Sequence, residues 1–278
     1  MPTQTKGRLI IIGGHEDRSP DGERTILKEV ARAAAKSNNR LALVTVATEM
    51  PKEVAAEYEA AFKSLNVELE LVDIRTREEA CDEEKVRKIE RAAAIFFTGG
   101  DQLRITSQIG DSLVFRCIRE RYQAGATVVG TSAGAAAMSG TMVVGGTSDA
   151  SFRIGALDMA PGLDFLPDTL IDSHFAERGR IGRLLGAVAQ NPRTLGLGID
   201  EDTAIVVERA KEFRVIGSGA VYVVDGSTIA YSNLAEQASD EIVTIHEARV
   251  HVLGAGNCFD LVERRPVALE LQEVSRRS

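Results

Sequence analysis

The sequence predicts an α/β fold: a three-layer sandwich with a mostly parallel central sheet between two layers of helices. Through residue 200, short β-branched runs that end in glycine or a polar residue alternate with amphipathic helical patterns. Beyond that point the pattern changes to strands joined by short turns, which is typical of antiparallel hairpins that extend a sheet or pack beside it. Together these two observations define the fold class.

The predicted parallel strands are uninterrupted apolar runs, as expected of strands buried on both faces. They cover Arg8–Ile12, Leu41–Ala47, Val67–Val72, Ala94–Thr98 and Thr127–Gly130. Between them, apolar side chains three and four residues apart predict amphipathic helices. These cover Glu23–Lys36, Lys52–Leu65, Arg77–Arg91 and Leu113–Ala124. Right-handed crossovers between such strands produce a doubly wound sheet covered on both faces.

The second half of the chain continues with strands. Predicted strands cover Thr169–Asp172, Leu195–Ile199, Thr203–Val207, Phe213–Ile216, Ala220–Val224 and Glu241–Leu253. Because no Pro- or Ser-rich linker, repeat or block of like charge divides the sequence, we expect one domain over residues 1–278.

Composition and charge exclude several classes of partner. The 278 residues include 33 Lys and Arg but 41 Asp and Glu, a net charge of −8, which disfavours a phosphate-backbone partner. The longest apolar stretches, such as 41–47, fall far short of the roughly 20 residues that span a bilayer, and we expect no signal segment. Cys81, Cys117 and Cys258 are far apart, which predicts neither a disulfide framework nor a thiolate metal site. We therefore expect a cytoplasmic protein with no nucleic-acid or membrane partner.

A nucleophile motif follows the fifth predicted strand. Residues 130–134 read G-x-S-x-G around Ser132, with an alanine-rich helix start behind them. Small residues at both ends of this motif permit the sharp strand–helix turn that presents a serine hydroxyl at the sheet edge. The first N–H groups of the helix would favour developing negative charge there. The alternative interpretation is a tight glycine-rich turn that binds an anion through its backbone.

A serine nucleophile needs a base, and His174 is the best candidate among the four histidines. It directly follows the predicted strand 169–172, so it lies at a strand end on the same rim as the serine. His15 also follows a strand, but its acidic neighbours are typical of an ordinary turn. His246 and His251 fall in the C-terminal strand region and are most simply edge or solvent-facing residues.

An orienting carboxylate for the base is offered by the acidic run Asp200-Glu201-Asp202, directly after the predicted strand 195–199. We predict that Glu201 or one of its neighbours has this role, at the same sheet edge as the serine and the histidine. Acids at a strand end are also typical of a solvated turn or a helix cap.

Chain order distinguishes two types of hydrolase. The order Ser132, His174, Glu201 differs from the Ser…Asp/Glu…His order of α/β-hydrolases. A small esterase would instead need Ser132 and Asp200 with His246 or His251. No HGGG oxyanion loop precedes the serine to favour that alternative.

The glycine pair in Thr98-Gly99-Gly100-Asp101 is suited to an oxyanion hole, since backbone N–H groups approach a tetrahedral intermediate closely where no Cβ intervenes. We predict that the N–H groups of Gly100 and Ala133 are the two donors. A nucleotide-binding loop is disfavoured because neither G-x-G-x-x-G nor G-x-x-x-x-G-K-[ST] occurs.

Three arginines follow the predicted base. A buried helical stripe of Ile181, Leu184, Leu185 and Val188 leaves them off that stripe near the helix start. Positive charge is disfavoured there, so a substrate carboxylate held by guanidinium groups is an economical explanation. The arginines are Arg178, Arg180 and Arg183, and the nearby acids Asp101, Asp172 and Glu177 could hold a cationic part of the substrate.

These stretches together resemble the cyanophycinase branch of the serine peptidase family that also contains peptidase E. The matching segments are residues 97–102, residues 130–135, Asp172-Ser173-His174-Phe175 with the three arginines, and Gly198-Ile199-Asp200-Glu201. The resemblance extends roughly from residue 10 to residue 208. It implies a fold related to class I glutamine amidotransferases, with the serine in place of their cysteine nucleophile.

The resemblance also implies roles for individual residues. Ser132 is then the nucleophile, His174 the base and Glu201 the orienting acid. The implied substrate-pocket residues are Asp101, Gln102, Asp172, Ser173, Arg178, Arg180 and Arg183. Many members have Gln where this chain has Ser173, a change that removes an amide contact.

The activity implied by the resemblance is hydrolysis of cyanophycin, a polyaspartate with arginine on each side-chain carboxyl, to β-Asp-Arg dipeptides. No metal or other cofactor is expected, and a homodimer is implied. The alternative within the family is an α-aspartyl dipeptidase acting on Asp-X dipeptides. A binding module of the same fold, with Ser132 as a turn residue, is the alternative outside enzymes.

Overall fold

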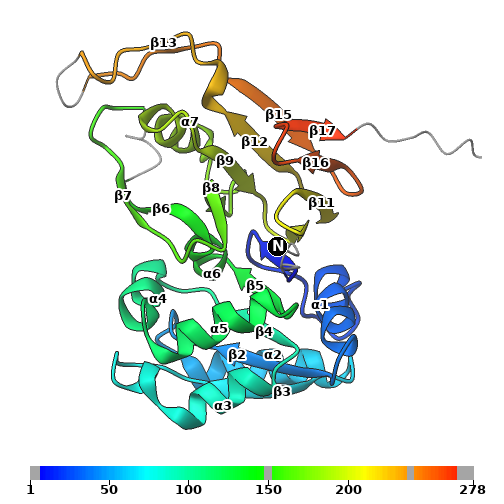
Figure 1. Ribbon diagram of the computed structural model, residues 1–278. Helices are drawn as coiled ribbons and strands as arrows, with labels where there is room; N and C mark the ends of the chain where they lie inside the picture. The colour runs from blue at the N-terminus through cyan, green and yellow to red at the C-terminus, as the bar shows by residue number, and fades with distance from the viewer. Residues whose placement is uncertain (1–6, 147–151, 237–240, 268–278) are drawn as a thin grey trace, which may run out of the picture.

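Two β-sheets form the centre of the structure (Figure 1), a computed structural model that describes residues 7–146, 152–236 and 241–267. Within these ranges the larger sheet has nine strands in the order β17-β16-β11-β10-β1-β5-β4-β2-β3. Its strands are β1 (Leu9–Ile12), β2 (Arg40–Val44), β3 (Glu68–Val72), β4 (Ala94–Phe97), β5 (Thr127–Thr131), β10 (Thr203–Glu208), β11 (Glu212–Gly217), β16 (Cys258–Asp260) and β17 (Arg265–Val267).

The larger sheet has a parallel and an antiparallel half. Strands β1, β5, β4, β2 and β3 pair in parallel. Strand β10 lies antiparallel to β1, and β11, β16 and β17 continue the antiparallel pairing. The predicted α/β fold with C-terminal antiparallel strands is therefore confirmed.

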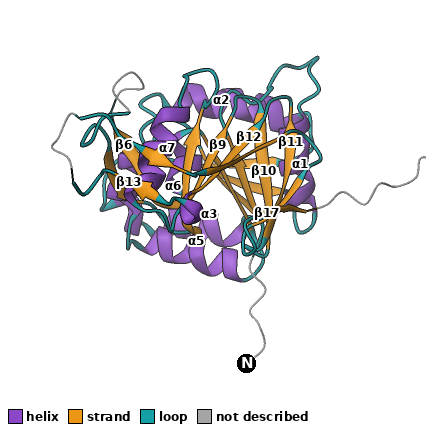
Figure 2. Cartoon of the chain, turned by 90° about the horizontal axis from the view of Figure 1, so that it is seen from above, coloured by secondary structure: helices purple, strands orange, loops and turns teal. Residues whose placement is uncertain are grey.

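Helices cover both faces of the parallel half, which gives three layers (Figure 2). Because successive residues of a buried strand point to opposite faces, Ile10 and Ile12 pack with α1 and α2, whereas Leu9 and Ile11 pack with α3, α4 and α5. The helices are α1 (Thr25–Ala35), α2 (Pro51–Lys63), α3 (Glu83–Arg91), α4 (Gln102–Ile109), α5 (Leu113–Gln123), α6 (Ala133–Ala137) and α7 (Ile181–Gln190).

The second sheet was not predicted. It has the order β15-β12-β9-β8-β6-β7, with parallel pairing only between β6, β8 and β9. One face joins the main core, where Leu197 and Val223 belong to the same cluster as Ile205, and α7 covers the other through Leu184 and Val188. Its strands are β6 (Ser139–Gly145), β7 (Asp158–Pro161), β8 (Leu166–Ser173), β9 (Leu195–Ile199), β12 (Val221–Asp225) and β15 (Arg249–Leu253).

Two predicted elements differ most from the structure. The helix predicted over 77–91 begins only at Glu83, because Asp82 accepts the N–H of Glu84 and caps it, and a 3₁₀ turn (Glu79–Cys81) precedes that cap. The strand predicted over 241–253 divides into two strands, β14 (Ile245–His246) and β15. Strand β14 pairs with β13 (Tyr231–Ser232).

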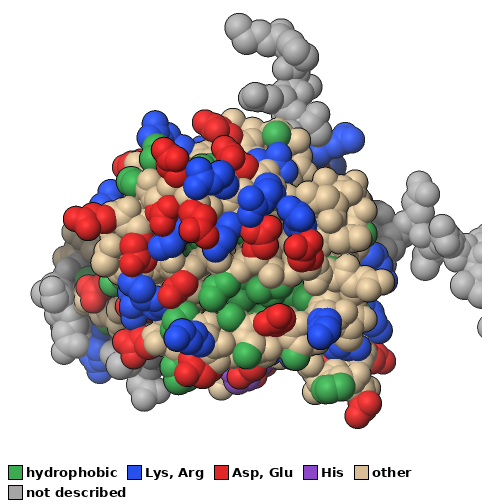
Figure 3. Space-filling view, turned by 90° about the horizontal axis from the view of Figure 1, so that it is seen from below, with side chains coloured by type: hydrophobic (Ala, Val, Ile, Leu, Met, Phe, Trp, Pro, Cys, Tyr) green, Lys and Arg blue, Asp and Glu red, His purple; other side chains and the backbone are tan. Residues whose placement is uncertain are grey.

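The surface carries charges of both signs. On the face shown in Figure 3, Lys and Arg side chains alternate with Asp and Glu around an apolar strip. Over the described part of the chain, no helix combines the length and the apolar character needed to cross a membrane.

Candidate active site

Ser132 lies on a sharp turn between β5 and α6. Its backbone has φ 53° and ψ −114°, a sparsely populated conformation that is maintained by its neighbours. A Cβ on Gly130 would lie 2.4 Å from the carbonyl oxygen of Gly134, and a Cβ on Gly134 would lie 2.4 Å from that of Phe97. Strand, turn and helix can approach this closely only with glycine at both positions, as the G-x-S-x-G pattern predicts.

Ser132 and His174 are in hydrogen-bond contact. The serine Oγ lies 2.8 Å from Nε2 of His174, and the histidine is buried with 4% of its surface exposed. His174 ends the run from β8 in a left-handed conformation, φ 49°, and its N–H donates to the carbonyl of Gly13. The side chain that the sequence favoured as base therefore reaches the serine.

The three acids after β9 have three different contacts. Oε1 of Glu201 lies 2.6 Å from Nδ1 of His174. Asp200 is buried and accepts the N–H groups of Ala176 and Ala220, and Asp202 accepts the N–H of Asp17. Only Glu201 of the three contacts the histidine, which resolves the choice that the sequence left open.

The strand ends that carry these side chains come from both sheets, so the prediction of one common sheet edge was wrong. Ser132 follows β5 of the larger sheet, whereas His174 and Glu201 follow β8 and β9 of the smaller one. The segment after β1 joins them: Ile12 accepts the N–H of Ser132, and Gly13 accepts that of His174. The carboxyl ends of β5, of the larger sheet, and of β8 and β9, of the smaller one, thus meet at one site.

Burial and hydrogen bonding set the charge states of the histidine–glutamate pair. Burial lowers the pKa of the His174 imidazole below its usual 6.5, and the hydrogen bond that His174 donates to Glu201 opposes this effect. The hydrogen bond from His174 lowers the pKa of the Glu201 carboxyl. At neutral pH the pair is therefore a neutral imidazole beside a carboxylate, the state in which Nε2 can accept a proton from Ser132.

Two cavities are lined in part by Ser132. One, of about 140 Å³, also contacts Gly100, Gln102, Ala133 and Ser173 and is lined by the three arginines. The other, of about 370 Å³, contacts His15, Glu57 and Tyr58. Gly100, Ser132 and Arg178 line both. We call them the arginine cavity and the Tyr58 cavity.

The arginines are organised by a buried carboxylate. Asp172, 2% exposed, accepts from Nη1 of Arg180 at 3.0 Å and from Nε of Arg183 at 2.8 Å, and also pairs with Nη2 of Arg183. Among the described residues, no carboxylate forms an ion pair with Arg178, which is exposed. Two guanidinium groups therefore engage both oxygens of Asp172, so a cationic part of the substrate would compete with the protein's own arginines for this carboxylate.

The other two predicted cation-holding acids also have internal partners. Asp101 caps α4 by accepting the N–H of Leu103, and Glu177 accepts the N–H of Glu201. Gln102 lines the arginine cavity and donates from Nε2 to the carbonyl of Val143.

The arginine-bearing segment differs in detail from its prediction. Arg178 and Arg180 precede α7, which begins at Ile181, so only Arg183 lies on the helix. Ile181 was expected in the buried stripe but is 39% exposed, whereas Leu184 and Val188 are buried. Arg180 instead turns inward, where Nη1 also donates to the carbonyl of Ser173.

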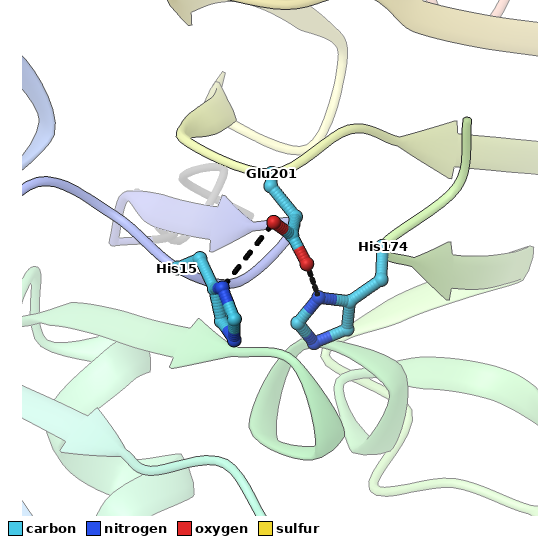
Figure 4. A group of neighbouring side chains, drawn as sticks. All are labelled: His15, His174 and Glu201. Atoms are coloured by element: carbon cyan, nitrogen blue, oxygen red, sulfur yellow. Dashed lines mark hydrogen bonds and ion pairs between the residues drawn. The ribbon is translucent and has the colours of Figure 1, made fainter. Parts of the chain in front are cut away.

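His15 belongs to this site, although the sequence did not predict it. It was assigned to an ordinary turn, but its Nδ1 lies 3.2 Å from Oε2 of Glu201 and its ring stands edge-on to that of His174 (Figure 4). The signal that could have found it was its place in the short loop that follows β1, whose end lies beside that of β5.

The esterase alternative has no geometric support among the described residues. Asp200 accepts backbone N–H groups, His246 packs at a tilt against Tyr231, and His251 contacts Phe259. The fold and the Ser132–His174–Glu201 contacts define instead a serine hydrolase on an α/β scaffold.

The particular family follows from comparison with known proteins. Residues 9–215 match the family model described as peptidase family S51, and the chain belongs to that family. It is a peptidase, in agreement with the predicted resemblance.

Similar proteins span almost the whole chain. A cyanophycinase of Trichormus variabilis is 38% identical over 266 residues, which cover 95% of this chain and 88% of that protein. A cyanophycinase of Geminocystis herdmanii is 35% identical over 270 residues, covering 96% and 98%. A solved peptidase structure from an acI-B1 Actinobacterium aligns with a TM-score of 0.71 at 18% identity, covering 92% of this chain and 98% of that one, which shows the fold alone.

Proposed function

We propose that this protein is a serine exopeptidase that hydrolyses cyanophycin, releasing β-Asp-Arg dipeptides through an acyl-enzyme. The observation that carries the proposal is the Ser132–His174–Glu201 chain of hydrogen bonds, whose serine lines the arginine cavity. A nucleophile beside a cavity lined by guanidinium groups suits a substrate that ends in carboxylates. The cyanophycinase relatives support the same substrate class.

In the proposed reaction His174 accepts the proton of Ser132 as Oγ attacks the scissile carbonyl carbon. Glu201 holds the imidazole in the required tautomer and stabilises the imidazolium that forms. His174 then protonates the leaving amine, and an acyl-serine remains. Water, deprotonated by His174, attacks this ester, and the proton returns to Ser132 as the acyl group leaves.

We propose that the N–H groups of Gly100 and Ala133 stabilise the oxyanion. Both residues line the cavity beside Ser132. Gly100 has φ +139°, and a Cβ there would lie 2.2 Å from the carbonyl oxygen of Ala47. This packing, which only glycine permits, brings the backbone of residue 100 to the serine.

We assign the carboxylate end of the substrate to the arginine cavity. Arg178, without a carboxylate partner among the described residues, offers its whole guanidinium for a bidentate contact. Arg180 and Arg183 add positive charge that Asp172 neutralises only in part, and Gln102 and Ser173 complete the wall. Asp101 affects this wall indirectly, through the cap of α4.

The substrate assignment is tested with a panel: purified cyanophycin, Asp-X dipeptides and p-nitrophenyl esters. We expect β-Asp-Arg from cyanophycin and much slower turnover of the other two. Cleavage of Asp-X dipeptides alone would establish the α-aspartyl dipeptidase alternative. Absence of any turnover, together with no labelling by two serine-directed reagents in intact mass spectra, would favour a binding module.

We further propose that the protein acts in the cytoplasm as a homodimer of one-domain chains. The three cysteines are free, which suits a reducing compartment, and the dimer is implied by the family resemblance. Light scattering of the purified protein tests the assembly: a mass of one chain would contradict it.

A further inference from the structure

Glu201 is contacted by two histidines (Figure 4). His174 approaches Oε1, at 2.6 Å, and His15 approaches Oε2, at 3.2 Å. The two imidazole rings are edge-to-face, with centroids 5.2 Å apart and an interplanar angle of 88°. The proposed peptide hydrolysis gives His15 no step, so its position beside the carboxylate calls for a separate explanation.

We propose that His15, His174 and Glu201 form a site for Zn²⁺, and that zinc bound there inhibits the peptidase. Each side chain offers one ligand atom, and these atoms lie within 4.8 Å of one another. Two imidazole nitrogens and a carboxylate oxygen are a donor set that proteins use for zinc, with water in the fourth position. Zinc binding follows from this geometry alone, whereas its inhibitory effect rests on the proposed function.

The spacing already fits zinc between His15 and Glu201, and it must widen between His174 and Glu201, where Nδ1 lies 2.6 Å from Oε1. Ligand atoms about 2.1 Å from a tetrahedral zinc ion lie about 3.4 Å apart, close to the 3.2 Å between His15 and Glu201. The His15 side chain is 69% exposed, so its ring is free to turn toward the ion. The backbones of His174 and Glu201 are already held in place, because their N–H groups donate to the carbonyl of Gly13 and to Oε1 of Glu177.

The Tyr58 cavity provides the entry path, because His15, His174 and Ser132 all line it. Arg178 lines the same cavity, and its positive charge disfavours ions that bind mainly by charge. Two imidazole ligands favour zinc over Mg²⁺ and Ca²⁺, which prefer oxygen ligands. The site should therefore discriminate strongly between these ions.

Zinc on His174 disables the base whichever ring nitrogen it takes. Bound at Nδ1, it replaces the hydrogen bond to Glu201 that fixes the tautomer. Bound at Nε2, it occupies the lone pair that accepts the proton of Ser132. In both arrangements removal of the metal restores the free triad, so the inhibition is reversible.

The binding test uses calorimetric titration of ZnCl₂ into the Ser132→Ala chain, with and without a second substitution, His15→Asn. Asn tolerates the left-handed backbone of residue 15, φ 49°, and removes the imidazole. We expect one zinc per chain, and at least about a ten-fold weaker affinity with His15→Asn, since even outer partners of metal ligands contribute ten- to hundred-fold. His246→Asn is the matched control, because His246 is also exposed but lies on β14. Equal zinc affinity with and without His15→Asn, or an equal loss with His246→Asn, would overturn the site.

The inhibition test measures dipeptide release from cyanophycin at increasing ZnCl₂. We expect EDTA to restore activity, MgCl₂ to leave it unchanged, and His15→Asn to raise the half-inhibiting zinc concentration by the same factor as in calorimetry. Binding that depends on His15 without inhibition would refute the inhibitory role. If the protein released no dipeptide at all, the proposed function would fail while calorimetry still decided the zinc site.

Discussion

Replacement of Asp172 by Asn should weaken both the fold and substrate binding. The carboxylate is 2% exposed and accepts from two guanidinium groups that are themselves 12% and 13% exposed. Asn keeps the size but removes the charge, and it turns an amide NH₂ toward Arg180 or Arg183. Two largely buried cations then face each other without a counter-charge.

The expected size follows from the burial of this network. Removing one partner of a buried ion pair costs about 3–5 kcal/mol of unfolding free energy. At about 2–4 °C per kcal/mol for chains of this size, Asp172→Asn should lower the melting temperature by about 6–20 °C. Because the arginines lose their anchor, KM for cyanophycin should rise more than kcat falls.

Asp168→Asn provides a matched control for thermal unfolding and kinetics. Asp168 pairs with Arg193 at 2.6 Å, but their side chains are 58% and 80% exposed. Such a surface pair contributes about 0–1 kcal/mol, so the melting temperature and KM should hardly change. Similar small effects from both substitutions would refute the organising role of Asp172.

Three further predictions concern the catalytic residues. Glu201→Gln should reduce kcat by about 10²- to 10⁴-fold with little change in melting temperature. The control Glu57→Gln, at an exposed residue, should leave kcat near the wild-type value. Equal kcat values for the two variants would contradict the role of Glu201. The acid limb of the kcat/KM–pH profile should lie below pH 6.5, because burial lowers the pKa of His174 and only the neutral imidazole accepts a proton. An acid limb above pH 6.5 would contradict His174 as the buried base. Gly14→Ala should reduce kcat by about 10²-fold, because a Cβ there would lie 2.3 Å from Cε1 of the His174 ring. Gly125→Ala is the control, because Gly125 has a similar φ, +106° against +109° for Gly14, but a Cβ there would have no atom within 4 Å, so kcat should be unchanged. An equal loss of kcat in both variants would point to backbone strain instead.

Local patterns predicted the parts of this site that depend on neighbouring residues. The strand before Ser132 and the glycines around it specify the elbow, and the position of His174 after β8 could be recognised from an apolar run. The order of these residues along the chain then distinguished this triad from that of α/β-hydrolases. These features need only short stretches of sequence, which is why the structure agrees with them.

Features that depend on tertiary packing were not predictable in the same way. The second sheet separates β8 and β9 from the larger sheet, although their apolar runs resemble the others. The contact of His15 with Glu201 and the pairing of Asp172 with Arg183 require segments to meet after folding. His15, next to two acids, has the sequence pattern of a turn, and arginines near a helix start have the pattern of a solvated face. Sequence periodicity carries no information on which partners these side chains meet across the fold.

Dipeptide release from purified cyanophycin, compared between wild type and Ser132→Ala by mass spectrometry, tests both the nucleophile and the substrate. We expect β-Asp-Arg from wild type and essentially none from Ser132→Ala at an unchanged melting temperature. Equal release by a folded Ser132→Ala chain would contradict Ser132 as the nucleophile. Absence of the dipeptide with the wild-type protein would contradict the proposed substrate.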